Sequence, residues 1–162
     1  MNFLKSLKNA FKGIIYCISS EINMRIHTVV ALYVLIFSRY FNLSFEKYII
    51  LFLTIGFVFS FELLNTCIEK MTDALIDKYD INVKIIKDLC AGSVLVVAIT
   101  ALIVGVFIFG DIKAIFLIFN NVLLNIKNLI SLVFLTVIST CYIKLGPIGI
   151  KNQLYKIITA KR

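Results

Sequence analysis

The chain turns from apolar to acidic in the stretch FELLNTCIEKMTDALIDKYDINVKIIKD, residues 61–88, which follows an apolar run over 48–61. This stretch begins with four regularly spaced polar residues: Glu62, Asn65, Glu69 and Asp73. Their offsets of three, seven and eleven fall within about 80° of one another on an α-helix, so the four side chains line one face. Because a charged carboxylate at bilayer depth costs at least about 2.5 kcal/mol, this face predicts a functional site.

The composition excludes an ordinary soluble domain. Of the 162 residues, 60% are hydrophobic and only 16% are charged. Open strands cannot satisfy their backbone groups in lipid, so we expect an all-α integral membrane protein. The net charge of +8 comes from basic residues at the ends of apolar runs, not from one patch with aromatic side chains, so we expect no nucleic-acid partner. The four cysteines are scattered and indicate free thiols, with no disulfide framework or zinc site.

Hydrophobic periodicity and length divide the chain into segments. Residues 3–20 are amphipathic and predict a helix that lies in the membrane surface. The apolar runs predict four spans, at about 28–43, 48–70, 89–109 and 129–145. We expect turns or loops at 39–47 and 77–87, an interfacial segment at 114–124, and a helix end at Gly146-Pro147, which holds the chain's one proline.

Basic residues predict the orientation of these spans. Thirteen lie before residue 26, between 70 and 87, or after 143, whereas the opposite connections hold four. The positive-inside rule then places the N-terminus, the 77–87 connection and the C-terminus in the cytoplasm of a cell-membrane protein. The acidic face and the segment SSEINMRIH, residues 19–27, would meet at the cytoplasmic interface.

The residues themselves indicate a chemistry but not a substrate. Two acidic clusters at one membrane face suit a hard cation, and a carboxylate in an apolar wall suits a general base toward a hydroxyl that arrives from the lipid. The sequence contains no phosphate-binding GxxxxGK[ST] loop, no HRD or DFG kinase motif and no GxSxG elbow. A cation carrier that uses the acidic face is an alternative, although the chain lacks paired broken helices.

Four blocks of sequence carry a resemblance: KNAFKG (8–13), ExNxRxH (21–27), ExLNTxIExxxD (62–73) and KDxxAGxV (87–94). In order and spacing they resemble the small prokaryotic diacylglycerol kinase family, and the ExNxRxH form is more similar to its undecaprenol kinase branch. The resemblance covers roughly residues 3–110. It implies a homotrimer of three-span subunits that transfers the γ-phosphate of ATP to the primary hydroxyl of a membrane lipid, with Mg²⁺.

The resemblance also implies roles for individual residues. Glu62 would be the catalytic base, supported by Asn65. Glu21 and Glu69 would be the metal ligands. Contacts to the nucleotide would come from a further set of residues: Lys87, Asp88, Asp73 and Tyr79. Arg25 would contact either a nucleotide or a lipid phosphate, and we expect His27 to be an interfacial residue outside the site.

The predicted organisation is therefore a lipid kinase domain, residues 1–110, and a C-terminal extension, residues 111–162, with an additional transmembrane helix. Undecaprenol, which would give undecaprenyl phosphate, is the substrate that the ExNxRxH form favours. Diacylglycerol, which would give phosphatidic acid, is the alternative, because both lipids offer a primary hydroxyl on an apolar chain. A non-catalytic membrane scaffold of the same fold is a further alternative.

Overall fold

The computed structural model describes residues 2–76 and 79–160, and this part of the chain is helical without strands. Its helices are α1 (Phe3–Ser20), α2 (Ile22–Ser38), α3 (Phe45–Leu75), α4 (Ile81–Phe109), α5 (Ile112–Leu124) and α6 (Ile126–Ala160). They form two compact units, one of Met1–Val30 with Ile118–Arg162 and the other of Ala31–Leu117. The predicted all-helical membrane fold with an extra C-terminal helix is confirmed.

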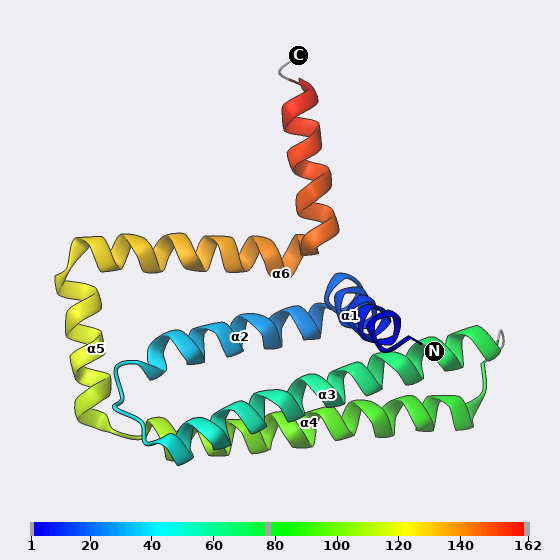
Figure 1. The fold of residues 1–162 in the computed structure, drawn as a ribbon, viewed down its shortest axis with the longest axis horizontal. Helices are drawn as coiled ribbons and strands as arrows, with labels where there is room; N and C mark the ends of the chain where they lie inside the picture. The colour runs from blue at the N-terminus through cyan, green and yellow to red at the C-terminus, as the bar shows by residue number, and fades with distance from the viewer. Residues whose placement is uncertain (1, 77–78, 161–162) are drawn as a thin grey trace. The chain divides into compact units, whose positions relative to one another are not determined.

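In the unit Ala31–Leu117, α3 and α4 form a long hairpin and lie side by side (Figure 1). At one end Phe41 meets Phe109 edge to face, with ring centroids 4.9 Å apart. At the other end Asp80 begins α4, because its Oδ1 atom accepts a hydrogen bond of 2.7 Å from the Asn82 N–H. The prediction of a loop over 77–87 was therefore wrong from residue 81 onward, and Asp77 and Lys78 lie outside the described residues.

The turn between α2 and α3 is shorter than predicted. Asn42 adopts a positive φ of 44°, a conformation that Asn tolerates better than most residues and that reverses the chain. Ser44 then occupies the N-cap position, so α3 begins at Phe45 and not after Lys47. As a result α3 is one continuous helix of 31 residues that carries the whole acidic face.

In the other unit, α1 ends where its chain becomes extended at Glu21, and α1 and α2 meet at an angle of 101°. Helix α1 covers the residues predicted for the surface helix, whereas its place in the membrane surface stays a prediction. Helix α6 bends at Gly146 and continues to Ala160, so the predicted helix end at Gly146-Pro147 is a kink instead (Figure 1). The fixed φ of proline suits the first turn of the helix that follows, which explains why Pro147 restarts it.

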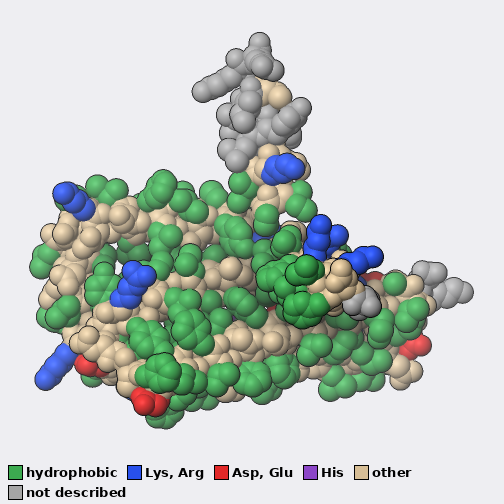
Figure 2. Space-filling view, in the orientation of Figure 1, with side chains coloured by type: hydrophobic (Ala, Val, Ile, Leu, Met, Phe, Trp, Pro, Cys, Tyr) green, Lys and Arg blue, Asp and Glu red, His purple; other side chains and the backbone are tan. Residues whose placement is uncertain are grey.

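Among the described residues, three helices are long and apolar enough to cross a membrane: α3, α4 and α6 over Ile126–Gln153. The bent pair α1–α2 reaches the same length and composition only when its two helices are taken together, because α2 alone has 17 residues. Hydrophobic side chains cover α3 and α4 in Figure 2, and Ile108 is the one buried side chain along α4. Exposed apolar surface on this scale is typical of contact with lipid or with other subunits.

We predict that Asp80→Ala destabilises the start of α4 by about 1 kcal/mol, because the Asn82 N–H loses its acceptor. The midpoint of thermal unfolding in detergent should fall, and Asp80→Asn, which keeps an acceptor oxygen, should restore most of the loss. An unchanged midpoint for Asp80→Ala would show that this cap contributes nothing.

Candidate active site

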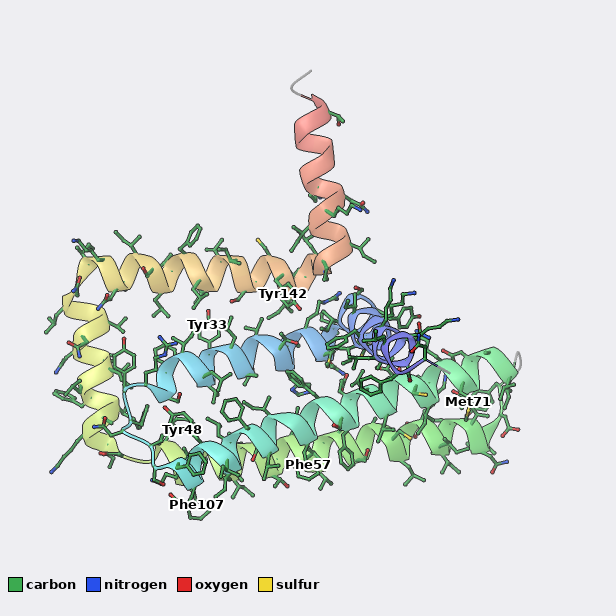
Figure 3. The ribbon with its side chains drawn as sticks, viewed as in Figure 1. Tyr33, Tyr48, Phe57, Met71, Phe107 and Tyr142 are labelled. Atoms are coloured by element: carbon green, nitrogen blue, oxygen red, sulfur yellow. The ribbon has the colours of Figure 1, made fainter. Side chains whose placement is uncertain are left out.

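The buried face of α3 changes from apolar to polar along the helix. Its buried side chains are Leu51, Val58, Glu62, Asn65, Thr66 and Thr72. Glu62 is the most deeply buried charged side chain in the described part of the chain, at 1% exposure. Of the polar face predicted from the sequence, which lies on α3 beyond Phe57 (Figure 3), Glu62 and Asn65 are therefore buried, whereas Glu69 is half-buried and Asp73 is exposed.

A hydrogen bond joins two members of this face. Asn65 Nδ2 donates to Glu69 Oε1 over 2.9 Å, which fixes the carboxylate of Glu69 relative to α3. Asn65 Oδ1 is buried and accepts no hydrogen bond from the described residues. Buried polar atoms are nearly always paired, so this amide oxygen is available to a ligand or a water molecule.

Two buried threonines on α3 were not predicted as part of this face. The Thr66 hydroxyl donates to the Glu62 carbonyl over 3.0 Å, and the Thr72 hydroxyl donates to the Glu69 carbonyl over 2.9 Å. Their offsets of four and ten from Glu62 are the sequence signal that places them near it on the helix. Because both hydroxyls bond to the helix backbone, they can be buried without competing for the carboxylates of Glu62 and Glu69.

The predicted nucleotide contacts lie near the connection between α3 and α4, at the closed end of the hairpin. The Lys87 ammonium on α4 donates to Asp73 Oδ1 on α3, and the two side chains are 35% and 57% exposed. Asp88 follows on α4 and is exposed, and Tyr79 in the connection is 79% exposed. The register of the hairpin brings Lys87 to Asp73, which lies 14 residues earlier in the chain.

Glu21 belongs to the other unit, where it ends α1. Its backbone is extended, and its N–H donates to the Cys17 carbonyl over 2.9 Å. One turn later Arg25 is buried, and its Nη1 atom donates to the Ser19 carbonyl over 3.1 Å. The described residues hold no cluster of three or more Asp, Glu, His or Cys side chains that would bind an ion alone.

The donors on α3 nevertheless fit a magnesium ion that is shared with phosphates. Mg²⁺ is usually bound by one or two protein carboxylates, and nucleotide oxygens and water complete its shell. The half-buried Glu69 carboxylate and the unsatisfied Asn65 oxygen are hard donors of this kind. A full protein cage is therefore not required for the predicted chemistry.

Comparison with known proteins identifies the family. The family model for prokaryotic diacylglycerol kinase matches residues 8–109. The chain belongs to the prokaryotic diacylglycerol kinase family. It is a membrane lipid kinase, as predicted.

Two named relatives of this lipid kinase differ in the lipid that they phosphorylate. The chain is 41% identical over 107 residues to the undecaprenol kinase of Bacillus subtilis, a match that covers 66% of this chain and 87% of the relative. It is 37% identical over 105 residues to a diacylglycerol kinase of Synechocystis, which covers 64% of this chain and 60% of the relative. No solved structure matches the chain.

The family match contains every residue predicted for the site. It ends at the last residue of α4, so α5 and α6 of the kinase lie outside it.

We predict that Asp73→Asn and Lys87→Met weaken ATP binding more than they weaken folding, because exposed ion pairs contribute little to stability. Each variant should unfold within a few degrees of the wild type without nucleotide, and each should lose most of the stabilisation that added MgATP gives. A large loss of thermal stability without nucleotide would instead assign the pair a structural role.

Proposed function

We propose that this kinase transfers the γ-phosphate of ATP to the primary hydroxyl of undecaprenol and forms undecaprenyl phosphate. The observation that carries this proposal is the 41% identity to an undecaprenol kinase over 87% of its length. The ExNxRxH form of residues 21–27 supports the same lipid. Diacylglycerol is the second candidate, and the similarity to the Synechocystis diacylglycerol kinase favours it.

In this proposal Glu62 is the catalytic base. Its carboxylate lies on the buried face of α3, directly after the apolar half of the helix, where a lipid hydroxyl would arrive from the bilayer. Glu62 takes the hydroxyl proton while the hydroxyl oxygen forms a bond to the γ-phosphorus and the bond to the ADP oxygen breaks. Burial excludes water, which would otherwise compete with the lipid for the phosphoryl group.

Asn65 and Glu69 form the second part of the proposed site. Glu69 and Glu21 are the residues that would hold Mg²⁺, and Asn65 orients Glu69 through its amide hydrogen bond. When bound, the ion would neutralise the phosphate oxygens during transfer. The role of this chain's residues is to hold the carboxylates in place so that no reorganisation is needed when the nucleotide arrives.

Lys87, Asp73, Asp88 and Tyr79 form the proposed nucleotide side of the site. The ion pair with Asp73 holds the Lys87 ammonium near the connection between α3 and α4, from which it can reach the phosphates. Asp88 and the exposed Tyr79 offer hydrogen-bonding groups to the remainder of the nucleotide. These groups lie at the end of α3 and the start of α4, where the side chains are charged instead of apolar. A charged surface of this kind suits a ligand that arrives from water.

We also propose the arrangement of the protein in the cell. The basic residues favour a cell-membrane kinase whose active site and C-terminus face the cytoplasm, where ATP is available. Residues 1–110 would form the kinase domain and 111–162 an extension. The family resemblance and the exposed apolar faces of α3 and α4 support a homotrimer.

We expect purified protein with MgATP to transfer labelled γ-phosphate to undecaprenol faster than to diacylglycerol when both are supplied in parallel. Glu62→Gln keeps the size of the buried side chain, so it should fold normally and lose about 10²- to 10⁴-fold in rate. Faster transfer to diacylglycerol would reverse the substrate assignment. Transfer to neither lipid by a folded wild-type protein would favour a membrane scaffold, and an active Glu62→Gln would remove Glu62 from the role of base.

We predict that Asn65→Ala raises the Mg²⁺ concentration needed for half-maximal activity by about 10- to 100-fold, because Glu69 loses the donor that orients it. Thr72→Val is the matched control, since it removes a buried hydroxyl on the same helix that bonds to backbone carbonyls. Its Mg²⁺ dependence should stay within about twofold of the wild type. Equal shifts in both variants would show that Asn65 has no specific effect on the metal.

A further inference from the structure

Gly146 in the C-terminal extension has a backbone conformation that L side chains rarely adopt. Its φ of 65° and ψ of 174° interrupt α6, one turn after Tyr142 (Figure 3). A Cβ atom at this position would overlap the guanidinium of Arg25, with the Arg25 Cζ atom 3.2 Å and the Cδ atom 3.6 Å away. Both residues belong to the same compact unit, in which α6 also packs against α1.

Arg25 is buried but only partly satisfied. Its side chain is 8% exposed, and Nη1 donates to the Ser19 carbonyl at the end of α1. Its Nε atom is buried without a hydrogen-bond partner in the described part of the chain. Because an arginine in a protein is always charged, a buried guanidinium with unused donors is suited to an anionic oxygen.

Three segments therefore hold this side chain: the end of α1, the start of α2 and the kink of α6. The first two lie inside the family match, whereas Gly146 lies well outside it. Arg25 is also one helical turn from Glu21, and its backbone N–H bonds to the Glu21 carbonyl over 3.4 Å. The extension thus contacts a residue of the kinase domain beside a proposed metal ligand.

We propose that Gly146 is a positioning residue for phosphoryl transfer: the kink of α6 holds the Arg25 guanidinium so that its free donors face a phosphate oxygen of the substrates. This inference rests on the proposed kinase function and adds a role for the extension. The long side chain of arginine loses much rotamer freedom when it binds a ligand. If the kink of α6 already fixes this side chain, the binding step no longer carries that loss of conformational entropy. Only glycine permits the contact, because any Cβ at position 146 would displace the guanidinium.

A double-mutant cycle in the full-length protein tests the proposal. Gly146→Ala, Arg25→Lys and the double variant are compared by kcat/KM for MgATP at saturating lipid and by thermal unfolding. Lysine keeps the positive charge but lacks the Nη1 atom that comes nearest to Gly146. Gly149→Ala is the matched control, because its Cβ would meet Leu145 of the same helix and not Arg25.

We expect Gly146→Ala to lower kcat/KM about tenfold when residue 25 is Arg, and less than about threefold when it is Lys. The unfolding midpoint should show the same less-than-additive loss, and Gly149→Ala should be additive with Arg25→Lys in both measurements. If Gly146→Ala does not fold, Arg25→Ala should recover part of the folded protein, because it removes the overlap but not the backbone strain of an alanine at this φ. No recovery at all would assign the need for glycine to backbone strain alone and would overturn the proposal.

The outcomes separate this inference from the proposed function. An active wild type in which the Gly146 and Arg25 effects are additive would overturn the positioning role and leave the kinase function intact. If the Gly146 and Arg25 substitutions are coupled in thermal unfolding but not in kcat/KM, the contact has only a structural role and the proposal is overturned. A wild type that transfers phosphate to no lipid would overturn both.

Discussion

The structure depends on one constraint, which is that polar groups at membrane depth must lie on a helix face turned away from lipid. A helix satisfies its own backbone, so its side chains alone decide what each face contacts. On α3 the face that begins with Leu51 and Val58 continues as Glu62 and Asn65 without a change of direction. The buried apolar side chains of α3 and the candidate base therefore lie on the same face of the helix.

This arrangement explains why the candidate site could be predicted from the sequence. The spacing of Glu62, Asn65, Glu69 and Asp73 is a local property, because helical periodicity is set by residues only a few positions apart. The bonds on this face are equally local: Asn65 bonds to Glu69, and Thr66 to the Glu62 carbonyl, each four residues away. Local order of this kind needs no knowledge of the tertiary fold.

Features that depend on long-range register could not be predicted. The partner of Asp73 is Lys87, which reaches it only because the connection after α3 is short and Asp80 starts α4 early. The loop predicted over 77–87 placed Lys84 and Lys87 outside any helix, although they lie in the first turns of α4. In the same way, Gly146-Pro147 is typical of a helix end, and its sequence does not reveal that α6 continues after the bend or that Arg25 lies beside Gly146.

The length of α3 has a consequence for how two dissimilar substrates could be brought together. At about 1.5 Å per residue, Glu62 lies about 26 Å from the first residue of the helix, Phe45, and Asp73 lies about 42 Å from it. A hydrocarbon core is about 30 Å thick. Helix α3 thus holds two acidic residues at fixed depths. Glu62 lies near the boundary of the lipid, and Asp73 lies about 16 Å further along, in water. An apolar lipid alcohol could stay in the bilayer and a polyanionic nucleotide in water, while both bind along α3 and their reacting atoms meet.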